Sequence, residues 1–144
     1  MFEQFAQLQD RIHAIVDRAE TILRSGVRDV AALGQIRWEV ARTLREYQLF
    51  KHSRIFDPIE RGQDYRAALA RRMKAECIRV GEEFRRYVLK WSVVSILDHW
   101  NEYHPAALDA IRRIRVHLAN ERPRISELLG VTSTPTSSGL PAGA

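Results

Sequence analysis

Apolar side chains recur every three or four residues from the second residue to about Leu129, which is the spacing of one face of an α-helix. No segment shows the strict alternation of apolar and polar residues that marks a half-buried strand. Ser25 and Gly26 are expected to end the first helix, because glycine tolerates the left-handed backbone found at helix C-termini. The apolar stripe of this helix consists of Phe5, Leu8, Ile12, Ile15, Ala19 and Ile22.

Two long helices are expected next. Asp29 is a suitable N-cap for the second helix, and the sequence Asp57–Pro58 with Gly62 is expected to break it. Its stripe consists of Leu33, Ile36, Val40, Leu44, Tyr47 and Ile55. The third helix is expected to begin near Asp64 and to end at about Trp91. Its stripe consists of Tyr65, Leu69, Met73, Cys77, Val80, Phe84 and Val88.

Residues 92–105 predict a short helical turn capped by Ser95 and Asp98, followed by a new helix that starts at Pro105. His104 precedes this proline, and a residue before proline is pushed away from helical backbone angles. Pro123 is expected to kink or restart the fourth helix, and Gly130 is expected to stop it. The stripe of the fourth helix consists of Leu108, Ile111, Ile114 and Leu118.

Together these elements predict an all-α protein. The expected architecture is an up-down-up-down four-helix bundle with a short extra helical segment before the fourth helix. Residues 1–130 would form one domain. Residues 131–144, which are rich in Ser, Thr, Pro and Gly, would form a disordered C-terminal tail.

Composition narrows the class of protein. A chain of 144 residues with 45% hydrophobic side chains is long enough to close its own core. No apolar run reaches the roughly 20 residues of a membrane span, and the first residues lack the order of a signal peptide, so a cytoplasmic protein without a membrane partner is expected. The net charge is +5, but acidic residues are interleaved with the arginines. This pattern favours solvated helix faces over a nucleic-acid-binding surface.

The candidate chemistry is sparse. The chain has no Gly-rich phosphate loop and no HExxH motif, and Cys77 is its single cysteine. We therefore predict no catalytic residues and no enzyme activity. His117 and Glu121 lie four residues apart, and Glu121 falls where the fourth stripe would carry an apolar side chain. Because a buried carboxylate needs a partner, Glu121 either reaches water or an arginine at a frayed bundle end or forms a ligand pair with His117. His13 and His52 flank their stripes, which favours boundary residues over metal ligands.

Four segments of the chain form a recognisable order: the first-helix segment LQDRIHAIVDRAETIL, the FDPI turn at Phe56–Ile59, the WNEY segment at Trp100–Tyr103 and HLANERPRISELL at His117–Leu129. Over Gln7 to Leu129 this order resembles the hemerythrin family. The resemblance implies a bundle around an oxygen-bridged iron pair, with His117 and Glu121, and less closely His13 and His52, as the ligands.

This sequence departs from the family's ligand pattern in two helices. Where the family has a His/Glu pair on the second helix, this chain offers Tyr47 with Lys51 or Gln48 with His52. The third helix presents Met73 and Cys77 instead of histidine, and these are poor ligands for an iron pair.

We therefore expect that the iron site is lost, that no cofactor is bound, and that the chain acts as a non-enzymatic binding or regulatory module. Two alternatives stay open. One is an iron-binding sensor of oxygen, nitric oxide or redox state that uses His13, His52, His117 and Glu121. The other is a basic protein that binds an anionic surface or nucleic acid through its arginines.

A second face of the second helix carries small residues around one large aromatic side chain: Ala31, Gly34, Trp38 and Ala41. Small residues let another helix approach closely, and an exposed tryptophan is often an interface anchor. We expect a homodimer, or another protein partner, at this face. The alternative is that Trp38 is buried against the protein's own segment from Ser95 to Tyr103.

Overall fold

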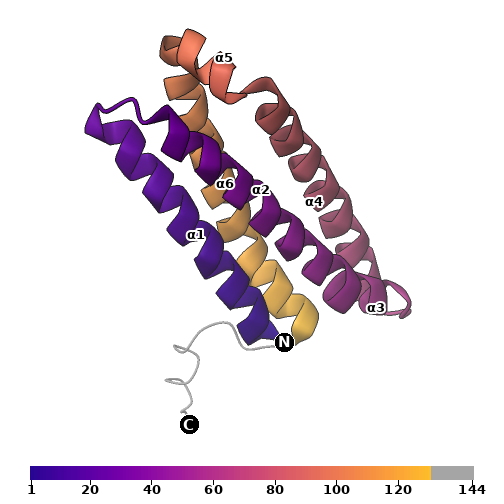
Figure 1. Ribbon diagram of the computed structural model, residues 1–144. Helices are drawn as coiled ribbons and strands as arrows, with labels where there is room; N and C mark the ends of the chain where they lie inside the picture. The colour runs from indigo at the N-terminus through magenta and orange to yellow at the C-terminus, as the bar shows by residue number, and fades with distance from the viewer. Residues whose placement is uncertain (131–144) are drawn as a thin grey trace.

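The computed structural model describes residues 1–130, and 90% of these residues are helical. No strand occurs in this range, so the predicted all-α class is confirmed. The predicted tail, residues 131–144, lies outside the described part. The four longest helices lie side by side (Figure 1): α1 (Phe2–Ser25), α2 (Val30–Lys51), α4 (Tyr65–Lys90) and α6 (Trp100–Leu129).

Each long helix packs against two others. Helix α1 contacts α2 and α6, and α4 likewise contacts α2 and α6. The short helix α5 (Val93–Asp98) joins α4 to α6 and contacts α2. None of the helices in residues 1–130 has the length and apolar character needed to cross a bilayer.

Most predicted helix ends are confirmed because local chemistry fixes them. The side chain of Asp29 accepts a hydrogen bond from the backbone N–H of Ala32, and Asp64 caps α4 through the N–H of Arg66. At the other ends, Gly26 and Gly130 adopt positive φ angles of 83° and 68°. These glycines take the left-handed conformation that commonly ends a helix.

The predicted break at Asp57–Pro58 is wrong. Helix α2 runs directly into a five-residue π-helical turn, η1 (His52–Phe56), and then into α3 (Asp57–Glu60). Pro58 lies in the first turn of α3 but inside the continuous helical run. Ser53 and Arg54, the residues before it whose carbonyls would lack its N–H donor, are exposed, so water can reach these carbonyls. The helical run therefore ends only after Glu60, close to the predicted stop at Gly62.

The expected start of the fourth helix at Pro105 is also wrong, since α6 begins at Trp100. Tertiary contacts hold the extra turn: the ring of Tyr103 lies 5.3 Å from that of Trp91, and Nε2 of His104 lies 2.7 Å from the carbonyl oxygen of Leu23. Ser92, rather than Ser95, caps α5 by accepting from the N–H of Ser95.

Helix α6 also continues through Pro123 without a restart. Pro123 and Ala119, one turn before it, are both exposed. Water can therefore reach the backbone carbonyl that the proline leaves without its helical N–H donor. This exposure explains why the helix tolerates a proline near its end.

The core follows the predicted stripes with a drift in register. In α1 the structure buries Val16 and Leu23, whereas the predicted Ile15 and Ile22 are only partly buried. Tyr65, predicted to face inward, is 69% exposed at the start of α4. Helix α2 carries a charged residue on its buried stripe, because Lys51 is 0% exposed.

Candidate functional site

Lys51 lies at the centre of a group of polar side chains inside the protein. It follows Tyr47 by one helical turn on α2, so both side chains point toward α6. Its Nζ atom lies 2.7 Å from each carboxylate oxygen of Glu121 and 3.1 Å from Sγ of Cys77. It also lies 4.1 Å from the centre of the Tyr47 ring. A buried ammonium needs such partners, because its loss of water costs several kcal/mol.

Glu121 of α6 is the acceptor in this group. It is 4% exposed, and its Oε1 atom accepts a hydrogen bond of 2.7 Å from the hydroxyl of Tyr47. Nε2 of His117, one turn earlier, lies 3.2 Å from the same oxygen. The interpretation that Glu121 reaches water or an arginine at a frayed end is wrong. Helix α6 continues past this position, and Ile125 in its next turn is fully buried.

Gln9 extends the group to α1. Its side-chain amide nitrogen donates to the hydroxyl of Tyr47 and to the backbone carbonyl of Leu118, both at 2.9 Å. Its carbonyl oxygen accepts from Arg122 at 3.2 Å, which links the group to the surface. The four longest helices therefore all contribute. We call the set the Lys51–Glu121 cluster; it consists of Gln9, Tyr47, Lys51, Cys77, His117 and Glu121.

The charges of the cluster stabilise one another. Burial alone would raise the pKa of Glu121, but the hydrogen bond from His117 and the charge of Lys51 outweigh burial and lower the pKa to about 2. Burial alone would lower the pKa of His117, but hydrogen bonds to Cys77 and Glu121 raise it to about 9. Burial, followed by the charge of Glu121, raises the pKa of Tyr47. At neutral pH the carboxylate is therefore ionised, and His117 is protonated beside it.

The structure brings together two of the four predicted metal ligands. His117 and Glu121 lie beside Cys77, and within residues 1–130 one donor atom from each of these three lies within 4.8 Å of the others. His13 and His52 are not members of this group. His13 is half-buried on α1. His52 lies on η1 beside the ring of Phe56, and its buried Nε2 atom has no hydrogen-bond partner among residues 1–130.

These donors do not fit an iron pair. An iron pair favours several imidazole and carboxylate ligands, whereas this group has one of each and a thiol. Both oxygens of Glu121 are already held by the Lys51 ammonium. The arrangement instead provides a buried ion pair, in which the protein supplies its own cation to Glu121.

Sequence reasoning did not find the partners of Glu121. It identified Tyr47 with Lys51 as one possible inward register of the second helix, and the structure adopts that register. The available signal was the continuation of the stripe from Tyr47 through Lys51 to Ile55 in steps of four. A lysine on one stripe and a glutamate on another are opposite charges that can pair inside a bundle.

The structure does not place the four predicted interface residues on one common surface. Gly34 is buried under α5, and an added Cβ would lie 2.8 Å from Cγ2 of Val93. Ala31 is exposed. Trp38 is 55% exposed, so the alternative in which it is buried against residues 95–103 is wrong. Trp38 and Ala41 line one side of a surface groove between α2 and α4, with a volume of about 390 Å³, which we call the α2–α4 groove.

Comparisons with models of protein families, with characterised proteins and with solved structures find no match to this chain. The resemblance to hemerythrins stays a prediction from the sequence.

Proposed function

We propose that this chain is a hemerythrin-like, up-down-up-down four-helix bundle that has lost its di-iron site and acts as a non-enzymatic binding or regulatory module. The observation that carries the proposal is the position of Lys51. Its ammonium binds both oxygens of Glu121, the carboxylate that the resemblance assigns to iron. A side chain of the protein thus supplies the positive charge that a metal ion would otherwise bring.

The neighbouring residues support the same proposal. Met73 and Cys77 occupy inward positions of α4 and are fully buried, and neither residue type is a preferred ligand of an iron pair. Glu76, the carboxylate next to Cys77, is exposed and binds Arg124 on the surface at 3.1 Å. Helix α4 therefore brings no carboxylate to the cluster.

Metal content tests this proposal. Elemental analysis of protein purified without chelators, with an ultraviolet–visible spectrum, is expected to find no stoichiometric iron. A chelator is expected to leave the melting temperature unchanged, because no bound ion stabilises the folded state. About two iron atoms per chain with oxo-bridge absorption would refute the proposal.

A second candidate is an atypical metal-binding sensor of oxygen, nitric oxide or redox state. The convergence of Cys77, His117 and Glu121 favours it, because thiolate, imidazole and carboxylate are the donors that single transition-metal ions use. Metal binding would require Lys51 to leave Glu121. Under this candidate, adding Zn²⁺ or Fe²⁺ raises the melting temperature of the native protein but not of His117→Ala. The same small effect in both proteins would dismiss it.

For the binding role, we propose the α2–α4 groove as the surface through which two copies associate. Three large apolar side chains at this groove are strongly exposed: Trp38 at 55%, Ile78 at 45% and Leu89 at 68%. Contiguous exposed apolar surface of this kind commonly marks a protein interface. A homodimer would remove these side chains from water.

A further inference from the structure

We propose that a second cleft, between α4 and α6, binds an aliphatic carboxylate such as a fatty acid. The alkyl chain would lie between the two helices, and the carboxylate would contact Arg86 and Lys90. This α4–α6 cleft shares no residue with the Lys51–Glu121 cluster or with the dimer-contact residues Trp38 and Ala41. The inference therefore does not depend on the hemerythrin-like proposal.

The interior of the cleft suits an alkyl chain. Its volume is about 320 Å³, which lies within the range of small-molecule sites. Phe84 and Tyr87 stack at a ring distance of 5.5 Å and are only partly buried. Such incompletely covered aromatic rings gain free energy when an apolar ligand removes them from water. The apolar lining includes Val80, Phe84, Tyr87, Trp91, Ala110 and Ile114.

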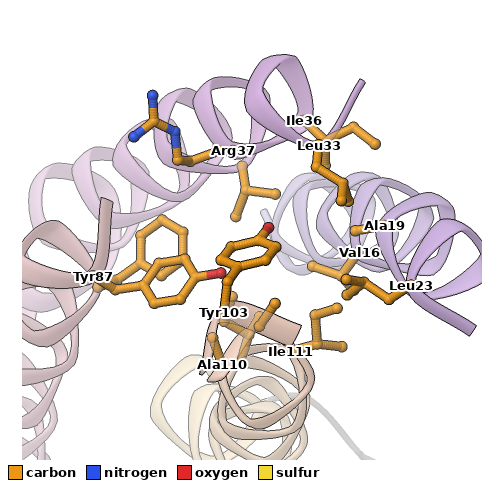
Figure 2. A pocket seen from close by; sticks show the side chains of 14 residues that line it. Val16, Ala19, Leu23, Leu33, Ile36, Arg37, Tyr87, Tyr103, Ala110 and Ile111 are labelled. Carbon is orange, nitrogen blue, oxygen red and sulfur yellow. The ribbon is translucent and has the colours of Figure 1, made fainter. Parts of the chain in front are cut away.

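A smaller space in the bundle interior adjoins the cleft. It has a volume of about 40 Å³ and shares the lining residues Phe84, Tyr87, Ala110 and Ile114 with the cleft. Figure 2 shows Tyr87 and Tyr103 on one side of this space, with aliphatic side chains of α1 and α2 opposite. A small apolar space beside the cleft suits the end of an alkyl chain, whereas a docked partner helix would need a broad, shallow groove. This shape favours a lipid-like ligand over a protein.

One charged side chain, that of Arg37, lines the inner cavity. Its Nη1 atom donates to the backbone carbonyls of Val88 and Trp91, and its buried Nε atom has no hydrogen-bond partner within residues 1–130. Figure 2 shows its guanidinium turned away from Tyr103. The head group of a bound amphiphile is therefore expected at the outer rim.

At the rim, the two acidic side chains are already paired. Glu83 binds Arg79 at 3.0 Å, and Asp109 binds Arg112 at 2.7 Å and Arg113 at 2.8 Å. Neither carboxylate is thus available to neutralise the remaining basic side chains of the rim.

Arg86 and Lys90 are these remaining basic side chains. Within residues 1–130, Arg86 has one carboxylate, Glu82, at the outer limit of 4.0 Å, and Lys90 has none within that distance. The two basic residues are four apart on α4, so they lie on the same face of the helix. Lys90 also lies over the ring of Trp91 at 5.2 Å. A rim with excess positive charge above an apolar interior matches a ligand with an anionic head and an apolar tail.

Calorimetric titration with dodecanoate below its micelle concentration tests the inference. Saturable binding of about one molecule per chain is expected. The double variant Arg86→Ala/Lys90→Ala is expected to lose about tenfold in affinity, because both charge-assisted contacts disappear. The matched control Arg71→Ala/Arg72→Ala removes the same charge from exposed positions of α4 outside the cleft and is expected to bind as the native protein does.

Two further measurements separate this site from non-specific adsorption. Dodecylammonium is expected to bind much more weakly than dodecanoate, since its head group is repelled at the rim. Ala110→Trp is expected to fill the cleft and abolish binding, with circular dichroism confirming that the variant stays folded. Equal affinity for the two amphiphiles, equal binding by both double variants, or no saturable binding would overturn the inference.

Discussion

At the scale of single residues, Lys51 and Glu121 depend on each other. Removing one member of a buried ion pair leaves the other charge without compensation, which typically costs about 3–5 kcal/mol. We expect Lys51→Met to lower the free energy of unfolding by less than this amount, measured by urea denaturation, because Glu121 keeps the protonated His117 and the hydroxyl of Tyr47 as partners.

The double variant Lys51→Met/Glu121→Met is the control for this prediction. Replacement of a whole buried ion pair by apolar side chains is often neutral or stabilising. The double variant is therefore expected to recover most of the stability lost by Lys51→Met. A single variant as stable as the native protein would show that the pair contributes nothing.

The pKa of His117 predicts how stability depends on pH. Its folded-state pKa of about 9 lies above the ordinary value of 6.5, so the folded protein holds this proton more tightly than the unfolded chain does. The resulting stability is fully present below about pH 6.5 and is lost as the pH rises through 9. We expect the free energy of unfolding to fall between pH 6 and pH 10 in the native protein.

His117→Gln is expected to flatten this fall, whereas His99→Gln, which changes an exposed histidine, is expected to keep it. An unchanged slope in His117→Gln would contradict the assigned protonation.

At acid pH, Glu121 affects the free energy of unfolding in the opposite direction from His117. Its pKa is lowered from 4.5 to about 2, so its contribution is present above about pH 4.5 and is lost as the pH falls through 2.

At the scale of helices and turns, Arg37 of α2 fastens the end of α4. Its Nη1 atom donates to the carbonyl oxygen of Val88 at 2.6 Å and to that of Trp91. The last carbonyls of a helix have no partners within the helix. Arg37→Met is therefore expected to cost about 1–3 kcal/mol and to speed amide hydrogen exchange at residues 88–96. The exposed Arg42→Met on the same helix is the control, and equal exchange in both variants would contradict this role.

The helix ends show which boundaries sequence reasoning can locate. Asp29, Asp64, Gly26 and Gly130 act through their own side chain or backbone on the next few residues, so the sequence was sufficient to place them. The start of α6 depends instead on distant contacts, including the one from His104 to Leu23. These contacts outweigh the preference of His104, the residue before Pro105, for non-helical backbone angles.

At the scale of the whole molecule, the exposed α2–α4 groove predicts self-association. Light scattering is expected to show a dimer whose population rises with protein concentration, and Trp38→Ser is expected to shift it toward monomer. Tyr65→Ser removes an aromatic side chain that is 69% exposed at the start of α4, outside the groove, and is expected to leave the dimer intact. A native protein that stays monomeric at high concentration would refute the dimer.

The candidate site was only half predictable, because part of it depends on contacts between helices. The spacing on α6 placed Glu121 on the buried face and His117 beside it, because both observations concern one helix. The pairing with Lys51, the contact with Cys77 and the bridge through Gln9 depend on how four helices are rotated against one another. The spacing of apolar residues locates the buried face of a helix only to within about one residue. In α1, for example, Val16 and Leu23 are buried in place of the predicted Ile15 and Ile22.

The Lys51 ammonium differs from a bound ion in one respect that matters in a cell. It is synthesised with the chain, at a fixed ratio of one to one, and is never exchanged with the surroundings. The charge balance around Glu121 is therefore complete as soon as α2 meets α6. Under the proposed loss of the iron site, scarcity of metal, competition between metals and the order of metal loading would have no influence on this step. The interior of the protein would then be assembled in the same form whatever the metal supply of the cell.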